Sequence, residues 1–110
     1  MQRTLAYDEF SKLDKEVIDN VEAVVCHNDD MALGIYDYYD VNKLDIPLIL
    51  GINNSFEMNE KIKAGQIYGT VDNGVKEQVE YIWNLWDSIL KEQAKDYERV
   101  WYSKPYGVSQ

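Results

Sequence analysis

The sequence is poor in the residues that build covalent or metal-bound scaffolds. It has one cysteine, Cys26, and one histidine in 110 residues. A single cysteine excludes an internal disulfide and a cysteine-based zinc cluster. Because free cysteine is usually buried and inert, we expect Cys26, which ends an apolar run, to be a core residue.

Basic residues are also scarce, with 11 lysines and arginines against 20 acidic residues and a net charge of −9. Such a surface repels phosphate backbones, and no basic stripe offsets the repulsion, so the composition excludes direct nucleic-acid binding by this chain. No apolar stretch is long enough to span a membrane, and the first residues lack the apolar core of a signal peptide. We therefore expect either a cytosolic protein or an exported one whose signal lies outside this chain.

The rest of the composition, 45% hydrophobic and 28% charged, is that of a folded protein. The length suits one small domain over residues 1–110, or a piece of a larger one. Apolar periodicity predicts an alternation of helices (8–20, 31–39, 55–63 and 75–95) and strands (21–26, 46–50, 67–71 and 99–102). The connections are long enough for right-handed crossovers, so we predict an α/β fold with a parallel sheet and helices on both faces.

The helix expected over 75–95 carries an apolar stripe of Val75, Val79, Ile82, Trp86 and Ile89. Long amphipathic helices usually pack on a sheet, so the stripe is expected to be core. If Trp83 and Trp86 were both exposed, they would mark a missing partner surface, through which copies of the chain could associate. Residues 103–110 are expected to run extended along the surface.

Polar residues follow three of the predicted strands. The amides and carboxylates among them are Asn28, Asp29, Asp30, Asn53, Asn54, Asp72 and Asn73. Each alone could be a helix cap. In open α/β sheets, however, ligands bind at the carboxyl ends of strands, and these groups match the vicinal hydroxyls of a sugar. Three successive strand ends with an amide therefore favour polyol binding.

Catalytic interpretations are weaker. Cys26 and His27 are neighbours in an extended segment, so their side chains point to opposite faces and cannot readily form a nucleophile–base pair. Asp29 and Asp30 could form a phosphoacceptor or magnesium pocket, but the later strand ends lack the lysine that such a pocket requires. We expect no enzymatic activity.

Four segments resemble motifs of periplasmic sugar-binding proteins of the ribose/galactose type. Residues 21–34 (VEAVVCHNDDMALG) resemble "EAVxxxNDxMAxG", and 46–53 (IPLILGIN) resemble "IPVxGxD". Residues 63–73 (KAGQIYGTVDN) resemble "xxGxxxGTVxN", and 102–108 (YSKPYGV) resemble the "VPYxGV" ending of galactose/glucose-binding members. The resemblance implies part of the C-terminal lobe of a type I periplasmic binding protein fold.

The resemblance implies that Asn28, Asn53 and Asn73 bind sugar hydroxyls, although the family commonly has an aspartate where this chain has Asn53. Glu22 matches a glutamate that completes a calcium site in galactose-binding members. The loop that supplies the other ligands is absent here, so we expect no cofactor in this chain and calcium only in a full-length parent.

Family members have two lobes that enclose the sugar. The resemblance therefore implies a fragment of an ABC-transport solute-binding protein, weak or inactive alone, whose partners are a monosaccharide, the missing N-terminal lobe and a membrane permease. The full-length form would be periplasmic or an extracytoplasmic lipoprotein. Two alternatives stay open: the effector-sensing domain of a lactose-repressor-type regulator, which shares the fold, and an α/β phosphoacceptor or enzyme domain that uses Asp29 and Asp30.

Overall fold

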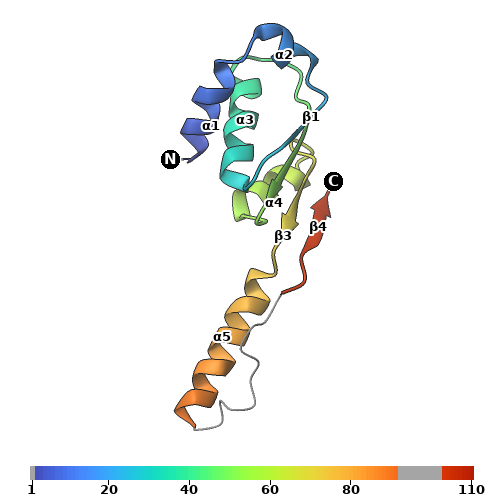
Figure 1. Cartoon of the computed structure of the whole chain (residues 1–110). Helices are drawn as coiled ribbons and strands as arrows, with labels where there is room; N and C mark the ends of the chain where they lie inside the picture. The colour runs from blue at the N-terminus through green and yellow to red at the C-terminus, as the bar shows by residue number, and fades with distance from the viewer. Residues whose placement is uncertain (1, 92–102) are drawn as a thin grey trace.

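The chain is described by a computed structural model covering residues 2–91 and 103–110 (Figure 1). The helices are α1 (Gln2–Ser11), α2 (Lys15–Asn20), α3 (Asp29–Val41), α4 (Phe56–Lys63) and α5 (Val75–Leu90). The strands are β1 (Ala23–Val25), β2 (Leu48–Ile52), β3 (Gly69–Asp72) and β4 (Tyr106–Ser109). The strand expected over 99–102 lies outside the described residues.

The strands form one sheet in the order β1-β2-β3-β4. The first three are parallel, with Val25 opposite Leu50 and Ile52 opposite Val71, which confirms the predicted α/β class with a mostly parallel sheet. Residues 103–110 run extended and are mostly exposed, as predicted, but the sequence did not predict that residues 106–109 form β4, which pairs antiparallel with β3. Gly69 permits this pairing, since a Cβ there would lie 2.7 Å from the Val108 carbonyl oxygen.

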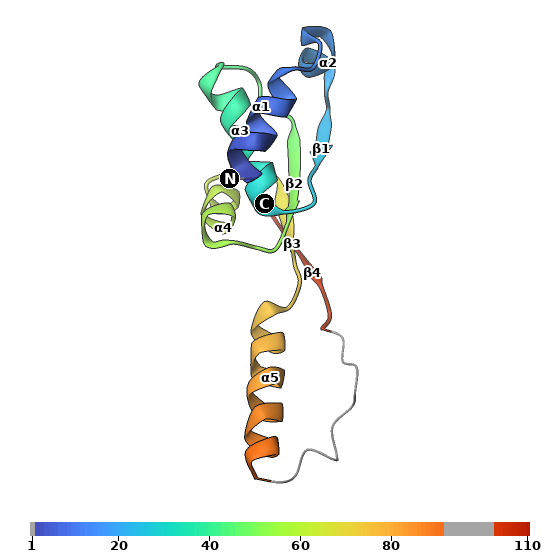
Figure 2. The same ribbon diagram turned by 60° about the vertical axis from the view of Figure 1, so that its left-hand side comes forward.

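The core lies between the sheet and the helices α1, α3 and α4, which occupy one side of the strands (Figure 2). Ile49 of β2 is fully buried on this side. The apolar spacing within residues 55–63 predicts that Met58 and Ile62 point inward, and both are buried. Val25 and Leu48 are 74% and 51% exposed. Within the described residues, helices therefore cover one face of the sheet rather than the two predicted.

The helix predicted over 8–20 is two helices, because the chain turns at Lys12 and Leu13, and Asp14, which precedes α2, has φ −58° and ψ 138°. The helical spacing of Phe10, Leu13 and Val17, with Ile18 beside them, predicts the apolar side of this helix. Of these residues only Ile18 is buried, and its carbonyl accepts a hydrogen bond from the Tyr39 hydroxyl. The lack of a side chain at Gly34 predicts a close approach of its helix to the sheet. The structure instead has α3 close against α1 at this residue. A Cβ at Gly34 would overlap the Arg3 carbonyl oxygen.

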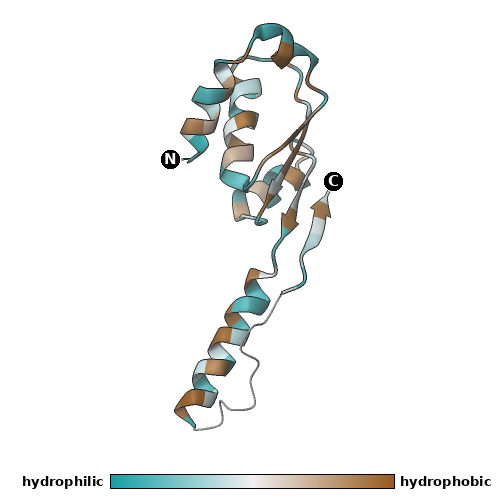
Figure 3. Ribbon diagram, viewed as in Figure 1, coloured by the Kyte–Doolittle hydropathy of each residue, from teal (hydrophilic) through white to brown (hydrophobic). Residues whose placement is uncertain are grey.

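Helix α5 projects away from the rest of the molecule, and none of its residues is buried (Figure 1). The molecule measures 61 × 26 × 18 Å, and its radius of gyration is 18.4 Å, whereas about 13 Å is typical of a compact chain of this length. Hydrophobic residues recur along the ribbon of the projecting helix (Figure 3), and the largest of them are exposed. The prediction that its stripe is core is wrong for this chain, because no other described element packs against it.

Trp83 is 69% exposed and Trp86 is 57% exposed. The sequence predicts that exposure of both tryptophans marks a surface that lacks its partner. Within the described part of the chain, no helix has the length and apolarity needed to cross a membrane.

Candidate functional site

The three predicted sugar-binding asparagines follow β1, β2 and β3, which are neighbours in the sheet. The β2–β3 ladder continues past the end of β2, because the Asn53 backbone NH donates to the Val71 carbonyl at 2.8 Å. On the other side, the Cys26 backbone NH donates to the Leu50 carbonyl at 2.9 Å. All three side chains therefore start from the same edge of the sheet, where the helices α3, α4 and α5 begin.

Asn28 caps α3, as its sequence position predicts. Its Oδ1 accepts a 2.9 Å hydrogen bond from the Met31 backbone NH, and its Nδ2 donates to Gln2 Oε1 at 2.6 Å. The side chain is half-buried, and its amide already has a partner at each end. Asn28 would bind a ligand through the second hydrogen of Nδ2, through the second lone pair of Oδ1, or after displacing Gln2.

Asn53 and Asn73 contact each other directly. Asn73 Nδ2 donates to Asn53 Oδ1 at 3.0 Å, and Asn53 is exposed. This contact leaves the Asn53 NH₂ group and the side-chain oxygen Oδ1 of Asn73 without a hydrogen-bond partner among the described residues. The pair therefore offers a donor and an acceptor side by side, an arrangement that suits adjacent hydroxyls, which both donate and accept.

The turn after β2 has an unusual backbone. Asn53 has φ 129° and Asn54 has φ 58°, both in the region that favours glycine. Asparagine tolerates such values better than most residues, but two in succession are costly and persist only when surrounding contacts hold them.

Asp72 supplies part of that support and is a residue whose role the sequence did not reveal. Its Oδ2 accepts from Asn54 Nδ2 at 2.9 Å and from the Tyr106 hydroxyl at 2.8 Å, and its Oδ1 accepts from the Gly74 backbone NH at 2.7 Å. These bonds, that of Asn54 foremost, lower the pKa of the Asp72 carboxyl. Asp72 thus links the β2 turn, β4 and the start of α5.

Asp29 is buried, with 2% of its surface exposed. Its Oδ1 accepts from the Thr70 hydroxyl and its Oδ2 from the Ser55 backbone NH, both at 2.6 Å. A carboxyl group enclosed in this way is not accessible as a phosphoacceptor. Its neighbour Asp30 is exposed and accepts a bond from the Arg3 backbone NH. No group of three or more potential metal-ligating side chains occurs among the residues that the structure describes.

Cys26 and His27 do not form a catalytic pair. Cys26 is buried as predicted, and burial raises the pKa of its thiol. His27 is exposed. Glu22 is exposed too, and it precedes β1, so it lies at the opposite end of that strand from Asn28.

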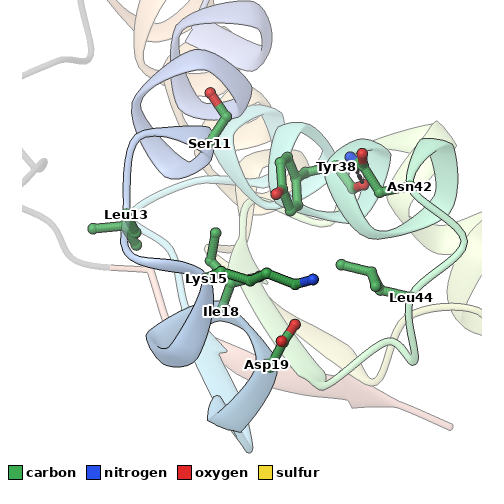
Figure 4. A pocket seen from close by; sticks show the side chains of 8 residues that line it. All are labelled: Ser11, Leu13, Lys15, Ile18, Asp19, Tyr38, Asn42 and Leu44. Atoms are coloured by element: carbon green, nitrogen blue, oxygen red, sulfur yellow. Dashed lines mark hydrogen bonds between the residues drawn. The ribbon is translucent and has the colours of Figure 1, made fainter.

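A cavity of about 340 Å³ lies at the far end of α3 from the candidate site (Figure 4). Asn42, which ends α3, lines it, whereas Asn28 begins the same helix of 13 residues. At 1.5 Å per residue the helix separates the two by about 20 Å. The cavity is therefore separate from the three asparagines.

No sequence profile of a known family matches the chain, and no curated protein matches it. Solved structures do match. One is an ABC transporter periplasmic solute-binding protein from Actinobacillus succinogenes with bound D-allose, at 20% identity and a TM-score of 0.78, covering 98% of this chain and 36% of that one.

Two further matches have similar coverage. The Caulobacter myo-inositol-binding protein, bound to myo-inositol, is 21% identical with a TM-score of 0.75, covering 98% of this chain and 36% of that one. A solute-binding protein from Bacillus halodurans with bound myo-inositol is 25% identical with a TM-score of 0.66. The match covers 98% of this chain and 35% of that one.

The chain therefore has the fold of part of a type I periplasmic binding protein, as the resemblance predicted, and it spans about a third of the length of these proteins. The matches cover 98% of the chain, so they include the projecting helix α5 together with the sheet.

Proposed function

We propose that this chain is the sugar-binding part of the C-terminal lobe of an ABC-transport solute-binding protein, and that it has no enzymatic activity. Its ligand is a monosaccharide of the galactose or glucose type. The parent protein is extracytoplasmic and delivers the sugar to a membrane permease.

The observation that carries this proposal is the Asn53–Asn73 pair at the sheet edge shared with Asn28. Neutral amides that offer both a donor and an acceptor are suited to sugar hydroxyls and poorly suited to activating a nucleophile. Support for a small polyol also comes from the matched proteins, which were solved with D-allose and myo-inositol.

A second lobe is part of the proposal, because one wall alone desolvates a sugar poorly. Ligand pockets bury most of their ligand's surface, whereas Asn53 is exposed here. The same lobe would cover the apolar side chains of α5. We accordingly expect this chain alone to bind sugar weakly, with a dissociation constant of about 1 mM or higher, equivalent to roughly −4 kcal/mol.

The test is an NMR titration of the ¹⁵N-labelled chain with D-galactose, D-glucose, D-allose and myo-inositol. We expect the side-chain amide signals of Asn28, Asn53 and Asn73 to shift together along a millimolar isotherm. The Asn42 amide, which donates to the Tyr38 carbonyl at the far end of α3, is the internal reference and should stay fixed.

Matched variants localise the effect. Asn73→Ala should abolish the shifts, while Asn20→Ala, which removes an exposed amide that donates to the Glu16 carbonyl, should leave them unchanged. The proposal fails if saturating sugar moves none of the three amides, or moves Asn42 as much as the others. Micromolar affinity would contradict the expectation that the chain is weak alone.

A further inference from the structure

Asp29 connects three parts of the candidate site. It begins α3 directly after Asn28, it bonds to the Ser55 backbone NH two residues beyond Asn53, and it bonds to the Thr70 hydroxyl three residues before Asn73. Its single carboxyl group therefore touches each segment that carries a predicted sugar-binding asparagine.

The surroundings of Asp29 are built around this carboxyl group. Gly51 of β2 leaves the space that Asp29 occupies, because a Cβ at Gly51 would overlap Asp29 Oδ1. Thr70 is itself buried, at 3% exposure, and its hydroxyl also lies 3.4 Å from the Asn54 backbone NH. Both Asp29 oxygens thus have partners.

A role as a helix-start acid does not account for this burial. An acidic side chain stabilises a helix N-terminus from the solvent, and the exposed Asp30 already supplies one in the first turn of α3. Burying a carboxyl group costs free energy unless hydrogen bonds compensate. At its buried position Asp29 forms hydrogen bonds to Ser55, which precedes α4, and to Thr70 of β3.

We propose that Asp29 is a positioning residue that fixes the spacing of Asn28, Asn53 and Asn73 by bonding to Ser55 NH and the Thr70 hydroxyl. Its effect on sugar affinity rests on the proposed function. Asp29 itself does not contact the ligand, because its oxygens are enclosed. It holds the turn with positive φ angles at Asn53 and Asn54 in the conformation that lets Asn53 meet Asn73.

The test replaces Thr70 rather than Asp29, since Thr70→Val exchanges a hydroxyl for a methyl group of similar shape and leaves Asp29 in place. Thr70→Ser retains the hydroxyl and should restore wild-type behaviour. Thr4→Val, an exposed position on α1, is the matched control for the loss of a threonine hydroxyl.

Two measurements are made on each folded variant. Amide hydrogen exchange compares Ser55 with Cys26, whose NH donates to Leu50 in the sheet. In Thr70→Val we expect Ser55 to exchange about 10-fold faster relative to Cys26, the effect of losing about 1.4 kcal/mol locally. The sugar titration should give a dissociation constant about 10-fold weaker, with Thr70→Ser and Thr4→Val close to wild type.

The outcomes separate the two proposals. Equal acceleration of Ser55 and Cys26 means that the hydroxyl contributes only to global stability, and this overturns the positioning role, as does an unchanged dissociation constant. If the wild-type chain shows no response to any sugar, the proposed function fails. The relative exchange of Ser55 still decides whether Asp29 positions the turn.

Discussion

Asn73 donates a 3.0 Å hydrogen bond to Asn53, and this single contact joins the segments that follow β3 and β2. The bond uses the Asn53 oxygen, so only the NH₂ group of that side chain still lacks a partner among the described residues. An aspartate at this position would keep the bond to Asn73 and add a second, charged acceptor. The identity of residue 53 therefore sets how many hydroxyl donors the site can satisfy.

We predict that Asn53→Asp strengthens sugar binding by about 3- to 10-fold, because hydrogen bonds to a charged acceptor are roughly twice as strong as neutral ones and so outweigh the loss of the Asn53 NH₂ donor. Aspartate also tolerates a positive φ. The measurement is the NMR titration described above. Asn20→Asp makes the same charge change at an exposed position and should leave affinity unchanged. Weaker binding by Asn53→Asp would indicate that the site uses the Asn53 NH₂ group as its donor.

Asp72 makes the stability of the chain pH-dependent. Its pKa is lowered in the folded state by Asn54, Gly74 and Tyr106, so its hydrogen bonds contribute stability above the ordinary aspartate pKa of 3.8. That contribution is lost as the pH falls below 3.8 through the lowered folded-state value. We predict that Asp72→Asn unfolds at a lower urea concentration than wild type at pH 7, and that the difference shrinks toward pH 2.

Urea unfolding measured between pH 2 and 7 checks this prediction. Asp45→Asn, at an exposed position in the connection before β2, removes the same charge and should track wild type at every pH. A constant difference between Asp72→Asn and wild type across the range would show that the protonation of Asp72 is not coupled to folding.

Gly34 controls the approach of α1 to α3. A Cβ there would overlap the Arg3 carbonyl and lie 3.1 Å from the Ala6 Cβ. We predict that Gly34→Ala destabilises the chain by about 1–3 kcal/mol through overpacking, although alanine forms helices better than glycine by about 1 kcal/mol. Gly107→Ala in β4, where a Cβ meets no atom within 4 Å, should be close to neutral in the same urea titration. A more stable Gly34→Ala would mean that α1 shifts without cost.

Lys43 follows the last turn of α3 with φ 54°, a conformation that costs a non-glycine residue about 1 kcal/mol. The turn is fixed by the bond from the Leu44 backbone NH to the Tyr39 carbonyl at 2.9 Å. We predict that Lys43→Gly raises the free energy of unfolding by up to about 1 kcal/mol. Lys43→Ala removes the same charge but keeps a Cβ, so the positive φ remains unfavourable. This variant should not raise the free energy of unfolding.

The sequence predicted the parts of the fold that depend on local pattern. Capping by Asn28, the inward residues Met58 and Ile62, and the parallel pairing of β1, β2 and β3 follow from apolar periodicity and from polar residues at strand ends. Such signals lie within a few neighbouring residues, so a single sequence contains them.

The break between α1 and α2 is a local feature that periodicity missed, and the other errors concern relations between distant residues. The stripe of α5 has the periodicity of a core helix, and periodicity cannot tell which surface covers it or whether that surface belongs to this chain. The pairing of β4 with β3 depends on the close approach of Val108 to Gly69, 39 positions earlier. The bonds of Asp29 and Asp72 likewise join segments that only the fold brings together.

The exposed side of α5 leads to the last prediction. Large apolar side chains exposed by between 48% and 69% project from it, including Ile82, Trp83 and Trp86. A single helix of 16 residues gains little stability in water without packing, so we expect copies of this chain to associate through α5 when no second lobe is present. The net charge of −9 opposes association, and salt should therefore strengthen it.

Sedimentation velocity at increasing protein concentration measures this association, and tryptophan emission should move to shorter wavelength as Trp83 and Trp86 become covered. The double variant Ile82→Gln, Trp86→Gln should remain monomeric. Phe56→Gln removes an 83% exposed aromatic side chain from α4 and should associate like wild type. If the wild-type chain is monomeric at all concentrations and its emission is that of solvated tryptophan, α5 has no affinity for its own copies. Its apolar side chains would then require a surface of different shape, such as the proposed second lobe.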